Sequence, residues 1–411
     1  MIRRSRGYIP LPIDLEFEIP QVLACGGELK NTFCLTRGRY AFLSQHIGDL
    51  KNWESLRFYE RSLEHFKRLF SIEPGIIAHD LHPEYLSTKY AVQLKHDMRY
   101  AICDMRLIGV QHHHAHIISC MVDNGVKGKV IGVAFDGTGY GTDGKIWGGE
   151  FLIADYRDFK RAGHLKYIPL PGGDKAIEEP YRMAISYLYQ TLGKDFQKLK
   201  LDFNRKWNKN KVQILLKMID KDINSPLTSS MGRLFDAVSS LIRICDISSY
   251  EAQAAIELQQ EAEKVTGSRL QATGYKYKIR EEKGIFIVDT RPIILGIVED
   301  LKKKVAEPII AAKFHNTVAE FTLDVCKRLK KKTGIDRVAL SGGVFQNRLL
   351  LDKTLEKLRK NSFICYTHSR VPTNDGGISL GQAVIAAKKY QATGCKPHVA
   401  CRKSLVVYDE R

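Results

Sequence analysis

The chain has 411 residues, of which 44% are hydrophobic, so it can form two domains that each bury an ordinary core. Its formal net charge of +18 favours an anionic ligand or partner, such as a nucleotide, RNA or an acidic protein. No apolar run approaches the ~20 residues of a membrane span, and the N-terminal stretch lacks the apolar core of a signal peptide, so we expect a cytoplasmic protein. Nine scattered cysteines without a C-x-x-C pair argue against a zinc ribbon and for reduced thiols.

The first part of the chain alternates strands and helices, which predicts an α/β lobe. Residues 1–15 are basic and contain prolines, and we expect them to be a linker or the tail of an upstream segment. A short strand at 21–24 precedes Gly26-Gly27, and two further strands, 32–36 and 39–44, follow with a turn between them. Glycines between strands can cradle a phosphate, although for Gly-Gly alone a plain β-turn is the favoured interpretation.

A helical period over residues 52–70 places Tyr59, Leu63 and Phe66 on one stripe, which we interpret as core. The sequence His79-Asp80-Leu81-His82 then follows an apolar strand. These residues could bind a metal, but packing at a strand end together with a helix cap is the favoured interpretation.

A histidine cluster follows the apolar run that starts at Leu107. If residues 111–122 form a helix, His112 and His116 are four residues apart on one face, a spacing that lets two imidazoles share a divalent cation. His113 and His116, three residues apart, would also point one way, so two histidine pairings compete. We expect His114 to pack or to face water.

A carboxylate follows the histidine helix. The strand 130–135 delivers Asp136 into a loop that carries Gly137, Gly139 and Gly141. Imidazole nitrogens suit iron and zinc, and a carboxylate completes a mixed site with room for a substrate oxygen. Four histidines within five positions beside an Asp-Gly-rich loop favour a metal site over a helix start that is merely rich in histidine.

The second half is more helical, with a long helix predicted over 307–330 and a Gly/Pro-punctuated hinge at 169–182. A buried strand, 337–340, runs into Ser341-Gly342-Gly343 and then a helix, a pattern that presents unpaired N–H groups to a phosphate. Asp375 opens the last helix, where it would serve as a cap or as a metal ligand. Residues 390–411 carry no clear signal.

Six separated motifs resemble one known family. They are VQHHHAH at 110–116, FDGTGYGTDGKIWGGEF at 135–151, PGGDKAIEEPYRMA at 171–184, GRLFDAVSSL at 232–241, LSGGVFQN at 340–347 and NDGGISLGQ at 374–382. They look like the C-terminal carbamoyl-transfer portion of the hydrogenase-maturation carbamoyltransferase. This portion is related to the tRNA threonylcarbamoyl-transfer enzyme and to antibiotic O-carbamoyltransferases. All belong to the actin/sugar-kinase/Hsp70 fold class, which implies two α/β lobes with a nucleotide cleft between them.

Carried onto this sequence, the resemblance implies site residues. It implies a divalent iron or zinc ion and a catalytic centre at His112, His116, Asp136 and Asp375. It implies nucleotide phosphates near Gly137, Gly139, Ser341, Gly342 and Gly343, with Lys30 as a further phosphate contact, and adenosine contacts near Gly232, Asp236 and Asn347. The nucleotide ligand would be ATP, AMP or carbamoyl-adenylate.

The implied reaction transfers a carbamoyl group from carbamoyl-adenylate to the C-terminal cysteine thiol of a partner maturation protein, toward the cyanide ligands of NiFe hydrogenase. None of the nine cysteines of this chain needs to be a nucleophile. In the family, three parts precede this region: an acylphosphatase-like domain, a C-x-x-C zinc module and an adenylate-forming domain. We find none of them in this sequence. We therefore expect a truncated chain or one half of a split enzyme, with those domains acting in cis or in trans.

Two other functions remain as alternatives. The tRNA-modifying relative shares the fold, the metal and the adenylate chemistry and would suit the positive charge, but H-H-H-A-H and S-G-G-V-F-Q-N are closer to the hydrogenase-maturation pattern, so nucleic acid is not the expected partner. A sugar kinase or ATPase module would bind nucleotide without transfer and would hold no transition metal tightly.

The expected domain division places lobe I, with the metal-binding wall, at 16–165. Lobe II, with the nucleotide-binding wall, is expected at 166–389, and its last helix returns to lobe I. The segments 1–15 and 390–411 lie outside both lobes in this scheme.

Overall fold

The computed structural model describes residues 2–4, 7–96, 105–201, 207–265 and 273–393. These residues form two compact units, which are described separately. Unit 1 contains residues 3–126 and the segment from Ser369 onward, and unit 2 contains residues 127–368. Within the described residues, no helix combines the length and the apolar character that crossing a membrane requires.

Unit 1 is built on a five-stranded sheet with the order β1-β3-β2-β4-β5. The strands β1, β3 and β2 are antiparallel, whereas β2, β4 and β5 are parallel. Their bounds are β1 Ile13–Ile19, β2 Val22–Ala24, β3 Cys34–Leu43, β4 Ile76–Asp80 and β5 Arg106–Val110. The helices are α1 Trp53–Phe70, α2 Leu86–His96, α3 His112–Asp123 and α13 Ile378–Ala392, and the 3-10 turn η5 Asp375–Gly377 precedes α13.

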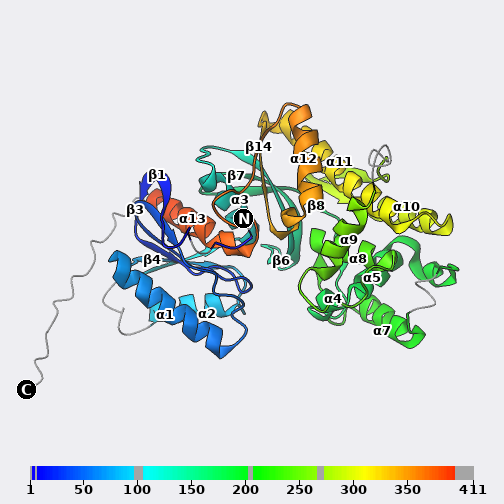
Figure 1. Cartoon of the computed structure of the whole chain (residues 1–411), viewed down its shortest axis with the longest axis horizontal. Coiled ribbons are helices and arrows are strands. Elements are labelled where there is room, and N and C mark those ends of the chain that lie inside the picture. The colour runs from blue at the N-terminus through cyan, green and yellow to red at the C-terminus, as the bar shows by residue number, and fades with distance from the viewer. Residues whose placement is uncertain (1, 5–6, 97–104, 202–206, 266–272, 394–411) are drawn as a thin grey trace, which may run out of the picture. The chain divides into compact units, whose positions relative to one another are not determined.

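The helices of unit 1 cover both faces of its sheet. In Figure 1, α1 and α2 lie on one side of the strands and α13 lies on the other. The stripe of α1 is buried as predicted, and Tyr59, Leu63 and Phe66 share one hydrophobic cluster with Phe33, just before β3, and Ile77 of β4. Asn52 begins this helix by accepting a hydrogen bond from the N–H of Ser55 at 2.8 Å.

Unit 2 contains a nine-stranded sheet whose main path is β11-β12-β8-β7-β6-β13-β14. Its strands are β6 Val130–Tyr140, β7 Ile146–Ala154, β8 Phe159–Leu165, β9 Ile168–Pro169, β10 Leu227–Thr228, β11 Lys278–Glu282, β12 Ile285–Asp289, β13 Arg337–Ser341 and β14 Ile364–Tyr366. Its helices are α4 Lys175–Glu178, α5 Pro180–Leu192, α7 Lys209–Asp220, α8 Met231–Leu241, α9 Gln253–Glu263, α10 Arg291–Lys302, α11 Glu307–Thr333 and α12 Arg348–Lys360, with 3-10 turns η2 Gly193–Lys198 and η4 Gly343–Gln346.

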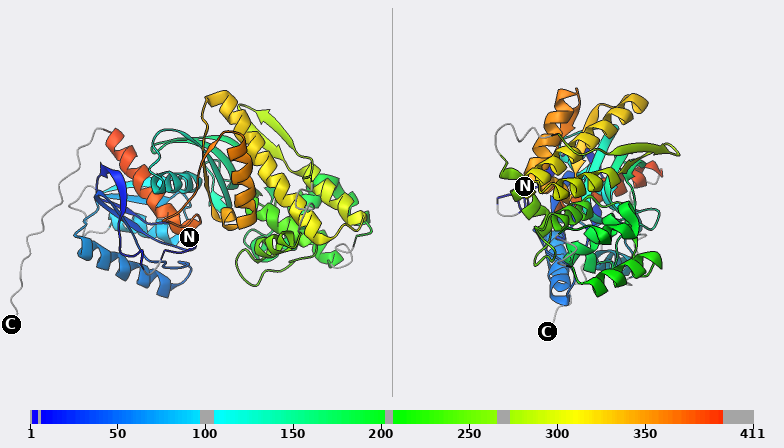
Figure 2. Two further views of the ribbon diagram at one scale, coloured as in Figure 1. Left: turned by 45° about the horizontal axis from the view of Figure 1, so that its top comes forward. Right: turned by 90° about the vertical axis from the view of Figure 1, so that its right-hand side faces the viewer.

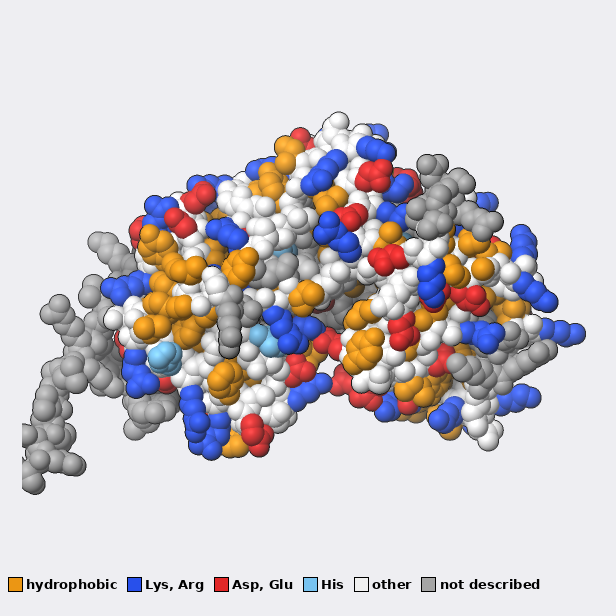
Figure 3. All heavy atoms as spheres, in the orientation of Figure 1, with side chains coloured by type: hydrophobic (Ala, Val, Ile, Leu, Met, Phe, Trp, Pro, Cys, Tyr) orange, Lys and Arg blue, Asp and Glu red, His pale blue; other side chains and the backbone are white. Residues whose placement is uncertain are grey.

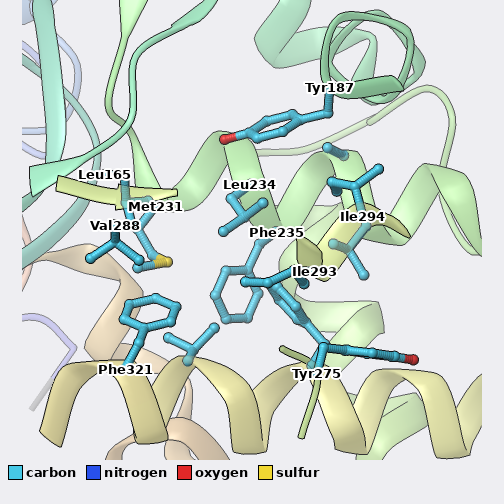
Figure 4. Close-up of a cluster of buried hydrophobic side chains, with 14 of the residues drawn as sticks. Leu165, Tyr187, Met231, Leu234, Phe235, Tyr275, Val288, Ile293, Ile294 and Phe321 are labelled. Carbon is cyan, nitrogen blue, oxygen red and sulfur yellow. The ribbon is translucent and has the colours of Figure 1, made fainter. Parts of the chain in front are cut away.

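The core of unit 2 is organised around α8. Figure 4 shows Met231, Leu234 and Phe235 of this helix between strand residues and the long helix α11, which contributes Phe321. Figure 2 shows α11 running along unit 2 as its longest helix. Because Met231, Leu234 and Phe235 are completely buried, the first turns of α8 are held firmly against the sheet.

The two sheets share one topological pattern. In each, a central strand has an antiparallel neighbour on one side and two successive parallel strands on the other, as β3-β2-β4-β5 in unit 1 and β7-β6-β13-β14 in unit 2. This duplicated α/β arrangement is the one expected for the actin/sugar-kinase/Hsp70 class, and the predicted fold class is confirmed.

Several boundaries differ from the prediction. The units divide between Val126 and Lys127 rather than near residue 165, because β6, β7 and β8 hydrogen-bond into the second sheet with β13 and β12. Where two strands with a turn were expected over 32–44, the structure has the single strand β3, Cys34–Leu43. The expected N-terminal linker is partly strand, since β1 begins at Ile13. Of the C-terminal tail, residues 390–392 continue α13, and residues 394–411 lie outside the described residues.

Candidate active site

The histidine cluster forms the start of α3, which follows β5 directly. Gln111 begins the helix because its side-chain oxygen accepts the N–H of His114 at 2.9 Å. All twelve residues of α3 are buried, including His114, which therefore packs rather than facing water. The rings of His112 and His116 have centroids 4.9 Å apart, whereas those of His113 and His116 are 6.3 Å apart.

A carboxylate from a distant segment meets two of these histidines. Asp375 Oδ1 lies 3.4 Å from Nε2 of His116 and 3.7 Å from Nε2 of His112. One ligand atom from each of the three residues lies within 4.8 Å of the others. The cap at the start of η5 is Asn374, whose side chain accepts the N–H of Gly376, so the carboxylate of Asp375 is not used as the cap.

Two imidazoles and one carboxylate are a donor set that suits divalent iron or zinc. The second nitrogen of His112 also fits a metal ligand, because its Nδ1 lies 2.7 Å from Oδ2 of Asp80 and both side chains are completely buried. A carboxylate that accepts the Nδ1 proton fixes the tautomer and orientation of the ring, and leaves Nε2 to donate to a metal. The side chains of unit 1 therefore fit a metal ion.

Asp80 contacts the candidate site, although the sequence favoured strand-end packing and a helix cap for the segment that contains it. Its Oδ1 does accept the N–H of His82 at 3.0 Å, as that interpretation requires. Its Oδ2 has a second role, which is to hold the ring of His112 through Nδ1 at 2.7 Å. The signal lies in strand pairing: Asp80 ends β4 opposite Val110 of the parallel strand β5, two residues before His112.

The glycine turn at Gly26-Gly27 is fixed by a hydrogen bond to another residue of unit 1. The N–H of Gly26 donates to Gln382 of α13 at 2.9 Å, so this N–H is already used. A Cβ on Gly27 would lie 3.7 Å from Oδ2 of Asp375, which places the turn beside the candidate metal ligand. Lys30 follows the turn in the left-handed conformation, at φ 48°, and its backbone N–H donates to Asp49 at 2.9 Å.

Asp136 and the glycines that follow it belong to unit 2. β6 changes register against β7 between Phe135 and Gly139, so Asp136 and Gly137 lie in an irregular stretch of the strand. The carboxylate of Asp136 accepts the N–H of Gly343 at 3.0 Å. The hydroxyl of Ser230, the cap of α8, lies 3.1 Å from the carbonyl oxygen of Asp136 and 2.5 Å from that of Gly137.

The Ser341-Gly342-Gly343 loop packs tightly on the same strand. Gly342 has φ +104°, and a Cβ there would lie 2.2 Å from the carbonyl oxygen of Phe135, so only glycine fits. The hydroxyl of Ser341 lies 2.8 Å from Nε2 of His368. The loop leads through η4 into α12, as the strand-loop-helix pattern predicted.

Asn347 and Asp236 were expected near adenosine. Asn347 caps α12 with its side-chain oxygen, which accepts the N–H of Leu350, and its amide nitrogen lies 2.9 Å from Nε2 of His315. His315 is the acceptor in that contact, because burial lowers its pKa to about 4 and its Nδ1 donates to the carbonyl of Ala311. Asp236 pairs with Arg233, and burial raises the pKa of its carboxyl to about 6.

The expected site residues therefore form two groups. Within unit 1 the structure brings together His112, His116 and Asp375, with Lys30 near the adjoining glycine turn. Within unit 2 it brings Asp136 and Gly137 against Gly232 and Gly343, while Gly139 pairs with Trp147 on β7.

Two family models match the chain. "HypF Kae1-like domain" matches residues 18–123, and "Carbamoyltransferase, Kae1-like Domain, second subdomain" matches residues 132–382. Carbamoyltransferase HypF of Rhizobium leguminosarum bv. viciae is 38% identical over 386 residues, which cover 94% of this chain and 47% of that protein. A carbamoyltransferase HypF homolog of Cupriavidus necator is 33% identical, and the match covers 90% of this chain and 92% of that protein.

A solved structure is also similar. The crystal structure of full-length HypF in the phosphate- and nucleotide-bound form has 47% sequence identity and a TM-score of 0.86, with 94% of this chain and 58% of that chain covered. The chain thus spans about half the length of most of the curated relatives it matches.

Proposed function

The chain belongs to the HypF carbamoyltransferase family, and on that premise we propose that it transfers a carbamoyl group from carbamoyl-adenylate to the C-terminal cysteine thiol of a partner maturation protein. The transfer is a step toward the cyanide ligands of NiFe hydrogenase. The observation that carries the proposal is the convergence of His112, His116 and Asp375, with Asp80 orienting His112, in a chain of this family.

We assign Asp136 as the fourth ligand of the metal and the catalytic role to the four ligands together. Iron or zinc bound there would supply a Lewis acid for the carbamoyl carbonyl or for the departing phosphate. The residues of the chain orient the site: Asp80 holds the His112 ring, and Gly343 holds the Asp136 carboxylate through its N–H at 3.0 Å. For the nucleotide we assign phosphate contacts to Lys30, Gly137, Gly139 and Ser341 to Gly343, and adenosine contacts to Gly232, Asp236 and Asn347.

The attacking thiolate is assigned to the partner because burial makes Cys25, Cys34 and Cys365 of this chain poor nucleophiles. Burial raises the pKa of the Cys25 and Cys34 thiols to about 12 and that of Cys365 to about 11, so these groups stay protonated at neutral pH. A partner cysteine at a chain end would bring an accessible thiolate instead.

The proposed reaction needs a supply of carbamoyl-adenylate. The longer relatives are about twice the length of this chain, and we propose that the segments which make the adenylate act on it in cis or in trans. The alternative, transfer of a threonylcarbamoyl group to tRNA, is less well supported, because one matching model is named as a carbamoyltransferase and the other as a HypF domain. On the face drawn in Figure 3, lysine and arginine side chains are scattered among carboxylates and do not form one continuous basic patch.

The test is a transfer assay with the metal-loaded chain, carbamoyl-adenylate and a partner that ends in cysteine, with the partner weighed by mass spectrometry. We expect the partner to gain one carbamoyl group. His116→Ala should lose both the bound metal and the transfer, whereas His65→Ala, an exposed histidine on α1, should keep both. Full metal content in a variant that lacks both His112 and His116 would refute the site, and no gain at saturating adenylate would refute unaided transfer.

A further inference from the structure

Arg233 occupies an unusual position in unit 2. It is the third residue of α8, only 6% exposed, and its backbone N–H donates to the capping hydroxyl of Ser230 at 3.1 Å. The first turn of α8 lies directly against the Asp136 loop, since a Cβ on Gly232 would come within 3.1 Å of Cα of Gly137. The guanidinium reaches the same place, with Nη2 3.9 Å from where a Cβ on Gly137 would lie.

The guanidinium is only partly neutralised. Nη2 lies 2.9 Å from Oδ2 of Asp236, but Nε and Nη1 are buried and have no hydrogen-bond partner among the residues that the structure describes. A buried guanidinium presents five N–H donors and normally satisfies them, because burying a cation without partners is costly. The raised pKa of the Asp236 carboxyl, about 6, indicates that this pair compensates its own burial poorly.

Three features at this point favour a negatively charged ligand. The N-terminal end of α8 carries a partial positive charge, Arg233 adds a full charge, and Gly137 has no side chain to keep a ligand away from the backbone. A neutral carbonyl would add no negative charge to the partial compensation that Asp236 gives Arg233. Within the proposed donor, carbamoyl-adenylate, the phosphate is the group that carries a negative charge, since the carbamoyl group and the adenosine are neutral.

We propose that Arg233 binds the phosphate of the adenylate beside Gly137 and so forms a cationic contact in addition to the metal site. This inference rests on the proposed function. Arg233 would hold the phosphate while it joins the adenosine to the carbamoyl group, and would stabilise the charge that develops on it as AMP departs.

The test compares AMP with adenosine, which differ by the phosphate, in calorimetric titrations of the full metal-loaded chain. Replacing Arg233 alone would leave the buried Asp236 carboxylate without its cation and endanger folding, so Asp236→Asn serves as the reference. Against that reference, the double variant Asp236→Asn with Arg233→Gln isolates the guanidinium. Arg328→Gln, on the exposed face of α11, is the matched control.

We expect the double variant to lose about 10- to 100-fold of the affinity for AMP relative to Asp236→Asn, with the affinity for adenosine unchanged. Arg328→Gln should leave both affinities at the wild-type values. Equal losses for AMP and adenosine, accompanied by a lower melting temperature, would assign Arg233 a structural role and overturn the inference.

An unchanged preference for AMP in the double variant would also overturn the inference about Arg233, and would leave the proposed transfer intact. A wild-type chain that transfers no carbamoyl group and binds neither AMP nor adenosine would instead overturn the proposed function, and the inference with it.

Discussion

Asp80 provides the sharpest test of the proposed metal site, because its contact with the site is made through His112. Its two carboxylate oxygens each accept one hydrogen bond, from the ring of His112 at 2.7 Å and from the backbone N–H of His82 at 3.0 Å. Asparagine has the same shape but only one acceptor oxygen. In Asp80→Asn the amide NH2 must therefore face one of these two donors, and the negative charge behind His112 is lost in either orientation.

The expected effect follows from that loss. Removing the partner that orients a metal-ligating histidine typically lowers metal affinity about 10- to 100-fold, or about 1.4–2.7 kcal/mol. The upper part of this range is appropriate, because Asp80 and His112 are both fully buried and no water can replace the carboxylate. Competition against a chromophoric chelator with iron and with zinc would measure the change.

The control is Asp14→Asn, which removes an exposed carboxylate of unit 1 that pairs with Arg39 at 2.7 Å. It should leave the metal affinity at the wild-type value. The reasoning fails if Asp80→Asn binds metal as tightly as the wild type while His116→Ala does not, since His112 would then need no orienting partner.

Two further predictions concern stability. Burial lowers the pKa of His315 from its usual 6.5 to about 4. Between these two values the unfolded chain binds a proton at this histidine and the folded chain does not. The free energy of unfolding therefore decreases as the pH falls below 6.5 toward 4. Between pH 7 and 5 the wild type should lose about 2 kcal/mol more than His315→Gln in urea unfolding, and equal losses would contradict this. Gly342→Ala should lower the free energy of unfolding by more than about 3 kcal/mol, because the new Cβ would meet the carbonyl oxygen of Phe135. The control Gly334→Ala, at φ +72° in open space, should lower it by only about 1–2 kcal/mol. Similar melting temperatures for the two variants would refute the steric argument.

The local patterns of the sequence predicted where several residues of the candidate site lie. Helical spacing selected His112 and His116 as one of two pairs, and the strand-loop-helix pattern selected Ser341 to Gly343. Periodicity could not indicate which strands become neighbours. Asp80 lies beside His112 only because β4 and β5 pair in parallel, and this pairing joins segments about 30 residues apart.

The strand and domain boundaries that the sequence predicted wrongly have the same cause, because they too depend on which strands pair. Gly38 has φ +59° and favoured a turn, yet β3 continues through it because its two halves have different partners. Gly38 pairs with Ile19 of β1, and Leu35 pairs with Leu23 of β2. Likewise β6 pairs with β7 next to it in sequence and with β13 about 200 residues later, and only the second pairing places β6 to β8 in unit 2.

The glycines of NDGGISLGQ explain how Asp375 reaches histidines some 260 residues earlier in the chain. Gly381 of α13 lies against α3 so closely that a Cβ there would come within 2.0 Å of the carbonyl oxygen of Ala115, and Gly377 is pressed against Pro372 in the same way, at 2.2 Å. The hydroxyl of Ser119 on α3 then donates to the carbonyl of Gly377 at 2.7 Å. A side chain at Gly381 would force α13 away from α3, and with it the carboxylate of Asp375, so these glycines set the distance on which the proposed metal site depends.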